Sequence, residues 1–274
     1  MKNRILISVL LASALLFSAC GGAEEEKVSP EMSKNMIKLK GYKFDTDGFF
    51  QSIQSGDKAL VNAFIDAGID PNGKNKAGAT PLIHALKEGD LGVVKAVARK
   101  ADVNLKDSVG NSPLHLAILL QNKEAVELFL SKNADVNSTG KDGKTNNQSA
   151  LFAAILASDS ELTKKLLEKG ADPNIADSDG AFPLAEACVR SQIDMDLVKL
   201  LIQKGADVNK AENNGATPLI YAASNQQTSA EARMELIKLL LEKGADKSIK
   251  DKSGKTAADW AEKIGTNDAA ELLK

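Results

Sequence analysis

Two Gly-Lys-Thr triplets, at residues 143–145 and 254–256, come nearest in this sequence to a phosphate-binding motif. A loop that cradles phosphates with its backbone N–H groups needs a further glycine five residues before the triplet. Those two positions hold Ser138 and Ile249. We therefore interpret both triplets as turns followed by a helix cap, and the sequence predicts no nucleotide site.

Part of a calcium-loop pattern falls between positions 175 and 186. Its third, fifth, sixth and twelfth places hold Asp177, Asp179, Gly180 and Glu186. The first place, which needs a charged ligand, is Ile175. The only two histidines, His84 and His115, have no cysteine or second histidine near them in the sequence. We therefore expect no metal site and no other cofactor.

Catalytic groups are equally sparse. Cys188 falls in an apolar segment, which predicts a buried thiol rather than a nucleophile. The sequence holds no Gly-x-Ser-x-Gly elbow and no zinc-protease helix. An enzymatic hypothesis would have to use Glu231 and Glu235 in an inserted segment, and no set of partner groups accompanies them. We expect no catalytic residues and no enzymatic activity.

Cys20 carries the clearest chemical prediction. Lys2 and Arg4 precede an apolar run over residues 5–17, and Ser18-Ala19-Cys20 follows, which is the layout of an export signal. As a helix the run would be roughly 20 Å long, shorter than the ~30 Å hydrocarbon core of a bilayer. The pattern therefore favours cleavage over a permanent membrane span.

Ser18-Ala19-Cys20 resembles the lipobox of bacterial lipoproteins. The resemblance implies that residues 1–19 are removed and that the Cys20 sulfur is acylated, which would anchor the chain in a membrane. Phe17 stands where this family usually has leucine, and the alternative is an ordinary secretory signal that leaves Cys20 a free thiol. Gly21 replaces the aspartate that retains some lipoproteins in the inner membrane. We expect a location in the bacterial cell envelope, at the outer membrane, facing the periplasm or the surface.

Residues 20–44 are predicted to form the lipidated cysteine and a flexible tether. The segment is polar and contains three consecutive glutamates at positions 24–26. Ser29 and Pro30 could nonetheless cap a short helix from Pro30 to Leu39. The sequence leaves the tether and the helix as alternatives here.

Composition limits the remaining function classes. The chain has 274 residues, of which 43% are hydrophobic and 26% charged, and this mixture is typical of a folded protein. Lys and Arg number 35 against 37 Asp and Glu, so the net charge is -2. A nucleic-acid binder usually has a basic surplus. The composition therefore disfavours a nucleic-acid partner.

Two marks recur along the chain at a common spacing. The first is a loop aspartate, followed two residues later by asparagine in all copies but the last, and successive aspartates lie 32 to 39 residues apart at Asp70, Asp102, Asp135, Asp172, Asp207 and Asp246. The second is a Pro-Leu pair, at Pro81, Pro113, Pro183 and Pro218. A fixed period between 20 and 50 residues indicates stacked structural units.

Each unit is predicted to consist of two short helices and a turn. Thr80, Ser112 and Thr217 can cap a first helix whose opening proline needs no hydrogen-bond partner. A second helix with apolar residues at helical spacing follows, as at residues 125–130. Gly170 then suits a left-handed helix end that leads into the next loop.

These residues resemble the ankyrin repeat, whose units pair a Thr-Pro-Leu-His helix start with a Gly-Ala-Asp-Val-Asn loop. The resemblance implies an all-α ankyrin-repeat solenoid of stacked helix-turn-helix units with projecting β-turn loops. It covers residues 45–274 in about seven units including the end caps. It also implies that His115 forms hydrogen bonds within the stack. Insertions near residues 145–148, 192–194 and 226–232 are expected to lie in loops.

In this family partners are met by the turn tips and by the concave face of the first helices. The resemblance therefore implies that candidate partner-binding residues lie at these positions. They are Lys74, Lys76, Lys106, Asp107, Lys141, Asp142, Asp177, Asp179, Lys210, Glu212, Tyr221, Lys250 and Asp251. Tyr221 is the first we would test, although a core role is an equal alternative.

We expect a membrane-anchored protein–protein interaction scaffold of the bacterial cell envelope. The expected partner is an unidentified protein, with a membrane held through the lipid on Cys20 and with no small-molecule substrate. A narrower alternative is a periplasmic inhibitor or immunity protein that neutralises a toxin or an enzyme. An enzyme with its site in the inserted loops is the third hypothesis.

Overall fold

The computed structural model describes residues 28–141 and 147–274. Cys20, the signal segment before it, Asp142 and the triplet at 143–145 lie outside these ranges. The described chain forms fifteen helices, α2 to α16, and one pair of two-residue strands. None of these helices has the length and apolar character needed to cross a bilayer.

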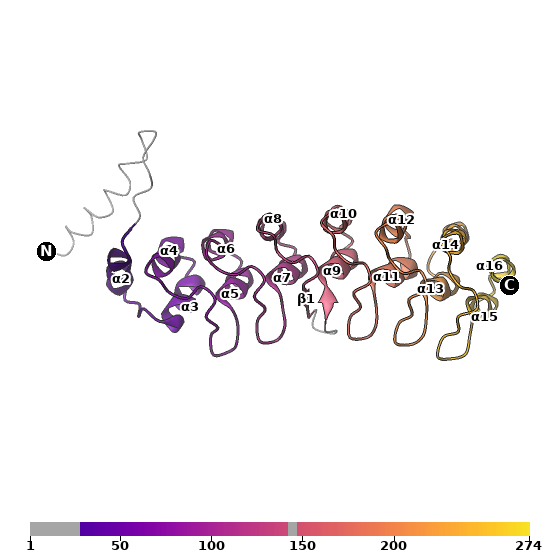
Figure 1. Ribbon diagram of the computed structural model, residues 1–274, viewed down its shortest axis with the longest axis horizontal. Helices are drawn as coiled ribbons and strands as arrows, with labels where there is room; N and C mark the ends of the chain where they lie inside the picture. The colour runs from indigo at the N-terminus through magenta and orange to yellow at the C-terminus, as the bar shows by residue number, and fades with distance from the viewer. Residues whose placement is uncertain (1–27, 142–146) are drawn as a thin grey trace, which may run out of the picture.

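Fourteen of the helices form seven successive pairs, as the repeat predicts. The pairs are α3 (Thr46–Gln54) with α4 (Lys58–Asp66), α5 (Pro81–Glu88) with α6 (Leu91–Ala98), α7 (Pro113–Leu119) with α8 (Lys123–Ser131), α9 (Ala150–Leu156) with α10 (Ser160–Glu168), α11 (Pro183–Val189) with α12 (Met195–Gln203), α13 (Pro218–Ser224) with α14 (Ala230–Glu242), and α15 (Ala257–Lys263) with α16 (Asn267–Leu273). Figure 1 shows the first helices in one row, the second helices in another, and the loops projecting to one side. The predicted all-α solenoid is confirmed.

The predicted helix starts are found. Thr80, Ser112 and Thr217 accept hydrogen bonds from the backbone N–H three residues ahead, and proline occupies the first turn after each. Ser149 caps α9 in the same way although no proline follows it. The first helix of the next unit differs, because Phe182 precedes it, makes no capping bond and is fully buried. Capping side chains therefore set most of the first-helix boundaries.

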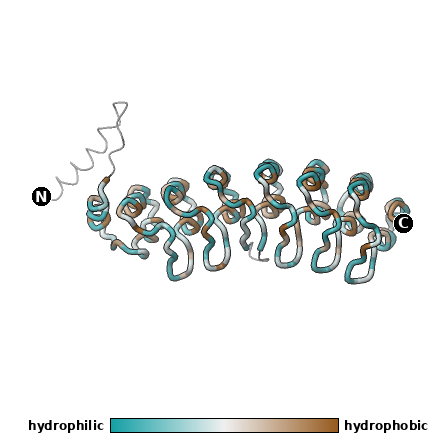
Figure 2. Tube along the Cα trace, viewed as in Figure 1, coloured by the Kyte–Doolittle hydropathy of each residue, from teal (hydrophilic) through white to brown (hydrophobic). Residues whose placement is uncertain are grey.

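One leucine per unit forms the centre of the stack. These leucines come from the first helices of five successive units and are at most 1% exposed; they are Leu82, Leu114, Leu151, Leu184 and Leu219. In Figure 2 the helices carry hydrophobic residues on some sides and hydrophilic ones on others, while the loops are mostly hydrophilic to neutral. The apolar side of each helix pair is covered by its neighbours, so a single core runs the length of the molecule.

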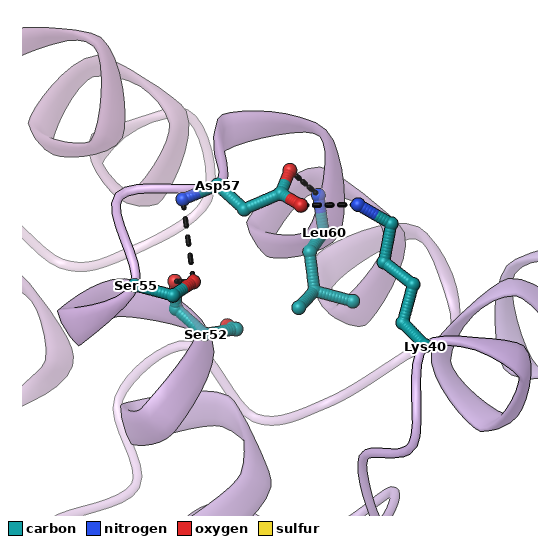
Figure 3. A network of polar contacts seen from close by, with 5 residues as sticks. All are labelled: Lys40, Ser52, Ser55, Asp57 and Leu60. Carbon is teal, nitrogen blue, oxygen red and sulfur yellow. Dashed lines mark hydrogen bonds and ion pairs between the residues drawn. The ribbon is translucent and has the colours of Figure 1, made fainter.

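The segment before the first pair is folded from Pro30 onward. Helix α2 (Pro30–Leu39) is capped by Ser29, buries Ile37 completely and packs against α4. Lys40 ends α2 and forms an ion pair with Asp57, which also accepts from the N–H of Leu60 and so caps α4 (Figure 3). Of the two alternatives for this segment, the tether over residues 20–44 is not found at residues 30–39 and the helix is, because the capped start and Ile37 give it an apolar side to bury.

The second insertion, at residues 192–194, lies in a loop as expected, whereas secondary structure borders or includes the other two. Strand β1 (Thr139–Gly140) pairs antiparallel with β2 (Gln148–Ser149) at the base of the first insertion. The third insertion lengthens α14, whose thirteen residues exceed any other helix described. The stack thus absorbs extra residues partly as secondary structure, without a break in the helix rows.

Candidate protein-interaction surface

A ladder of hydrogen bonds fixes the spacing of the projecting loops. In each rung, an asparagine Oδ1 of one loop accepts from the backbone N–H of the repeat aspartate in the next. The rungs are Asn72 to Asp102, Asn104 to Asp135, Asn137 to Asp172, Asn174 to Asp207 and Asn209 to Asp246, at 2.7–2.9 Å. Each repeat aspartate also accepts from the N–H two residues later in its own loop, as Asp102 does from Asn104 at 2.8 Å. The Asp-x-Asn mark therefore holds the loops at a constant spacing.

A second polar position folds the tip of four of the loops, through Asn75, Asp107, Asp177 and Asp251. Asp107 Oδ1 accepts from the N–H groups of Val109 and Asn111 at 3.1 and 2.9 Å. Asp177 makes the equivalent pair of bonds. Asp107 is only 7% exposed, so the expectation of a projecting carboxylate is corrected at that residue. Its side chain is turned inward because it satisfies the N–H groups of the tight turn.

The predicted lysines differ in how far they project. Lys74, Lys141 and Lys250 are exposed at their turns, as is Asp179. Lys76 lies 3.4 Å from Asp47, an exposed pair. Lys106 is half-buried and donates to Thr139 Oγ1 at 2.9 Å. Lys210 donates to the Asn174 carbonyl and lies 5.4 Å from the ring centroid of Phe182. The loops thus expose some lysine side chains to solvent and hold others against the helix stack.

The first helices contribute one row of side chains at a single repeat position. This position lies two residues after each leucine of the core row and, in the last unit, two residues after Ala258. From the first complete unit onward, it holds His84, Leu116, Ala153, Glu186, Tyr221 and Trp260. The predictions included Tyr221 alone, although the repeat register placed every other member of the row beside it. We call this row the wall, and two of its members, Tyr221 and Trp260, form hydrogen bonds with loop residues.

Tyr221 joins this wall to a loop. Its hydroxyl donates to the carboxylate of Glu212 and accepts from Asn214 Nδ2 at 2.8 Å. Burial and the hydrogen bond to Glu212 raise the pKa of Tyr221 to about 12. The ring also packs on the core, so the core alternative for Tyr221 is found, and its role in partner binding stays a prediction.

Trp260 repeats this arrangement in the last unit. Its Nε1 donates to Asp251 Oδ2 at 2.7 Å, and Lys263 Nζ lies 4.3 Å from its ring centroid. Burial alone would raise the pKa of Asp251. Hydrogen bonds from Ser253, the Lys255 N–H and Trp260 outweigh burial and lower this pKa to about 2. Asp251 is therefore an anion that fixes both its own turn and the indole.

The wall is acidic where the fifth and sixth units meet. Burial raises the pKa of Glu212, and repulsion from Asp177, Glu186 and Asp179 acts in the same direction. Burial also raises the pKa of Glu186, although its pairing with Arg190 at 3.4 Å opposes this. Carboxylates from two loops and one first helix thus contribute negative potential to one part of the surface.

Two of the groups considered for catalysis and metal binding, His115 and Cys188, are buried in the core, whereas Glu231 and Glu235 are exposed. His115 is fully buried, and its Nε2 lies 3.2 Å from Gln148 Oε1. Gly140 lies against the same imidazole, since a Cβ there would come within 2.1 Å of Nδ1. Cys188 is buried as predicted, and burial raises the pKa of its thiol. In residues 28–141 and 147–274 no three His, Cys, Asp or Glu side chains are grouped to hold a metal ion.

A family model described as ankyrin repeats (three copies) matches residues 49–140, 151–251 and 187–274, which together are more than half of the chain. The chain belongs to the ankyrin-repeat family. Ankyrin arrays bind partners along the surface bordered by their loops and first helices. Ankyrin repeats indicate a protein–protein interaction scaffold.

Individual relatives share only parts of the chain. An ankyrin repeat-containing protein of Treponema pallidum (strain Nichols) is 32% identical over 116 residues, which are 42% of this chain and 39% of the relative. Ankyrin repeat and SAM domain-containing protein 6 of Rattus norvegicus is 39% identical over 101 residues, 35% of this chain and 11% of the relative. The chain thus spans less than half the length of these curated relatives.

The crystal structure of the ankyrin repeat domain of Bcl-3 has the same fold. It superposes with a TM-score of 0.62 and 24% identity, over 82% of this chain and 96% of that chain. The likeness extends over most of the helix pairs described above. At 24% identity this similarity supports the fold and says nothing about a partner.

Proposed function

We propose that this ankyrin-repeat protein is a lipid-anchored scaffold of the bacterial cell envelope that binds a partner protein along its loop-bordered surface. The observation that carries the proposal is the ladder of five asparagine rungs, which holds loop tips with exposed lysines at a fixed spacing. Loop tips that are already rigid lose little conformational entropy when a partner binds. Less of the interaction energy is therefore spent on ordering them.

The anchor is the acylated Cys20, and the outer membrane is the expected location because Gly21 follows it. Two or more acyl chains hold a protein on a bilayer far more firmly than one, at about 0.8 kcal/mol per buried methylene. Supplying growing cells with an alkyne-bearing fatty acid tests this step. We expect the label on the wild-type chain and none on Cys20→Ala. A label that survives in Cys20→Ala would exclude Cys20 as the acylated residue.

The binding surface is tested by two triple variants with the same change in charge. Lys74→Glu, Lys141→Glu and Lys250→Glu reverse exposed loop lysines, whereas Lys164→Glu, Lys199→Glu and Lys238→Glu reverse exposed lysines on the second helices. Envelope proteins cross-linked to the wild type are identified by mass spectrometry. We expect the loop variant to lose a partner that the helix variant keeps, and equal retention by both would contradict the assigned surface.

The stoichiometry of the purified pair distinguishes the narrower hypothesis. A tight one-to-one complex that abolishes the activity of a bound toxin or enzyme would indicate the inhibitor or immunity role. A complex that leaves the partner active supports the scaffold.

A further inference from the structure

Helix α2 closes the N-terminal end of the stack, and one of its sides is uncovered. Ser33 and Ile37 face α4 and are buried, while Met32 and Leu39 are 49% and 65% exposed. Met32 and Leu39 are seven residues apart and so share one side of the helix. Figure 1 shows α2 at the end of the helix rows, where it has a neighbour on one side only among the helices that the structure describes.

Exposed apolar side chains are concentrated at this end. Eight large hydrophobic residues are exposed in the described ranges, and four of them lie within residues 28–44: Val28, Met32, Leu39 and Phe44. The remaining four are spread over units that each have neighbours on both sides. A cluster of this kind on a soluble fold marks a contact surface.

The same end is basic in a protein that is otherwise acidic. Residues 28–44 contain four lysines and one glutamate, whereas residues 45–274 contain 28 Lys and Arg against 33 Asp and Glu. Lys40 is paired with Asp57. For Lys34, Lys38 and Lys43 no carboxylate lies within ion-pair distance in the described part of the chain.

These three lysines line a shallow cavity of about 340 Å³ together with Tyr42 and Phe44. No carboxylate lines it. Lys34 Nζ lies 5.1 Å from the ring centroid of Phe44, whose ring stacks on Phe64 at 5.9 Å. Three ammonium groups beside an aromatic ring offer both charge and apolar contact to one ligand.

We propose that this N-terminal face, the end of the stack that carries Lys34, Lys38, Lys43 and Phe44 around the cavity and exposes Met32 and Leu39 on another side of α2, rests on anionic phospholipid headgroups. Lysines are drawn to the negative surface of the bilayer, and apolar side chains enter the boundary between headgroups and acyl chains. The proposal rests on the proposed lipid anchor, because Cys20 precedes α2 by only ten residues and would hold this end of the stack beside the membrane. The helix rows would then extend away from the bilayer.

The test uses the chain from Gly21 to Lys274 without acylation, which retains the whole described core from Ile37 to Leu273. Its binding to phosphatidylcholine vesicles is compared with binding to vesicles in which a third of the lipid is phosphatidylglycerol. The basic variant carries Lys34→Gln, Lys38→Gln and Lys43→Gln. Its control changes three exposed lysines at the opposite end, Lys247→Gln, Lys250→Gln and Lys252→Gln. Circular dichroism melts confirm that both variants are folded.

We expect binding to the anionic vesicles only, and affinity lower by on the order of a hundredfold in the basic variant, with the control unchanged. Equal binding to both vesicle types, or equal loss in both variants, would overturn the proposal. So would a dimer of the wild type that dissociates in Met32→Ser/Leu39→Ser, since the face would then join two copies. Because this chain has no acyl group, the outcome is independent of whether Cys20 is lipidated in cells.

Discussion

Tyr221 connects the first helix of its unit with the loop beside it through a single hydroxyl. The hydrogen bond to Glu212 is made only when the phenol keeps its proton, and the pKa of about 12 records this preference. A pKa that is higher in the folded than in the unfolded chain means that folding is favoured below the ordinary value of about 10. This contribution to stability is lost as pH rises from there through the folded value.

We predict that Glu212→Gln lowers the pKa of Tyr221 toward the ordinary tyrosine value without reaching it, because burial remains. The chain has two tyrosines, so Tyr42→Phe serves as the background in which the phenolate of Tyr221 is followed by ultraviolet absorbance. Tyr221→Phe in the same background removes the signal and confirms the assignment. An unchanged titration in Glu212→Gln would show that burial alone raises this pKa.

Residues with a repeat counterpart were predictable, and residues without one were not. Thr80, Ser112 and Thr217 are caps because each precedes Pro-Leu in register. Gln148 lies in an insertion that no other unit shares, so no repeat counterpart predicts its buried position beside His115. Asp107 has the register of a loop tip, but the backbone N–H groups that it satisfies become evident only once the turn is folded.

At the scale of elements, Asp57 combines two tasks that substitutions can separate. It caps α4 through the Leu60 N–H and pairs with Lys40 at the end of α2, and the bond to Lys40 is the main cause of its lowered pKa. Because the folded-state pKa lies below the ordinary value, the stabilisation is present at neutral pH and is lost as pH falls through the folded value.

We predict that Asp57→Asn costs at most about 1 kcal/mol of unfolding free energy, since only an exposed ion pair is lost and the cap remains. Asp57→Ala removes the cap as well and should cost about 1 kcal/mol more. Denaturant titration at neutral pH measures both. Lys40→Met, which breaks the pair alone, should match Asp57→Asn, and a loss as large as that of Asp57→Ala would contradict this division.

Helix α9 offers a matched pair for testing the core row. We predict that Leu151→Asp destabilises the protein by more than about 3 kcal/mol, because an unpaired charge would be buried between neighbouring units. Leu156 lies on the same helix and is 42% exposed, so Leu156→Asp should cost far less. Denaturant midpoints provide the comparison. Similar losses in the two variants would mean that the helix, rather than the leucine row, is sensitive to aspartate.

Element boundaries were predictable where capping and apolar period agree. Helix α2 was left as an alternative because its start is well capped while its composition is polar, and only packing against α4 decides between the two. The extension of α14 was expected as a loop, since an insertion has no register from which to infer helix. Contacts between units, rather than the local sequence, determined both outcomes.

Over the whole molecule, contacts between units are made with neighbours, so stability should vary along the stack. Trp260 is the only tryptophan and lies in the last unit, and its fluorescence therefore reports on that end. Ala270, 2% exposed on α16, holds this unit together. A charge at this buried position should destabilise the C-terminal unit and should have no direct effect on the stability of the distant units.

We predict that Ala270→Asp shifts the denaturant midpoint of Trp260 fluorescence well below that of far-ultraviolet circular dichroism, which averages over all helices. In the wild type the two midpoints should lie closer together. Glu271→Asp, a conservative change at the exposed neighbouring residue, should leave both midpoints in place. Coincident transitions in Ala270→Asp would show that the array unfolds as one cooperative body.

The asparagine ladder also affects how the number of repeats can change during evolution. Every rung uses the same donor and the same acceptor, and it joins a loop only to its successor. If the segment between two equivalent aspartates were deleted or duplicated, each remaining loop would therefore still find its hydrogen-bond partner in the next loop. Unequal recombination within this gene would therefore lengthen or shorten the loop-bordered surface by whole units. The geometry within each unit would stay the same.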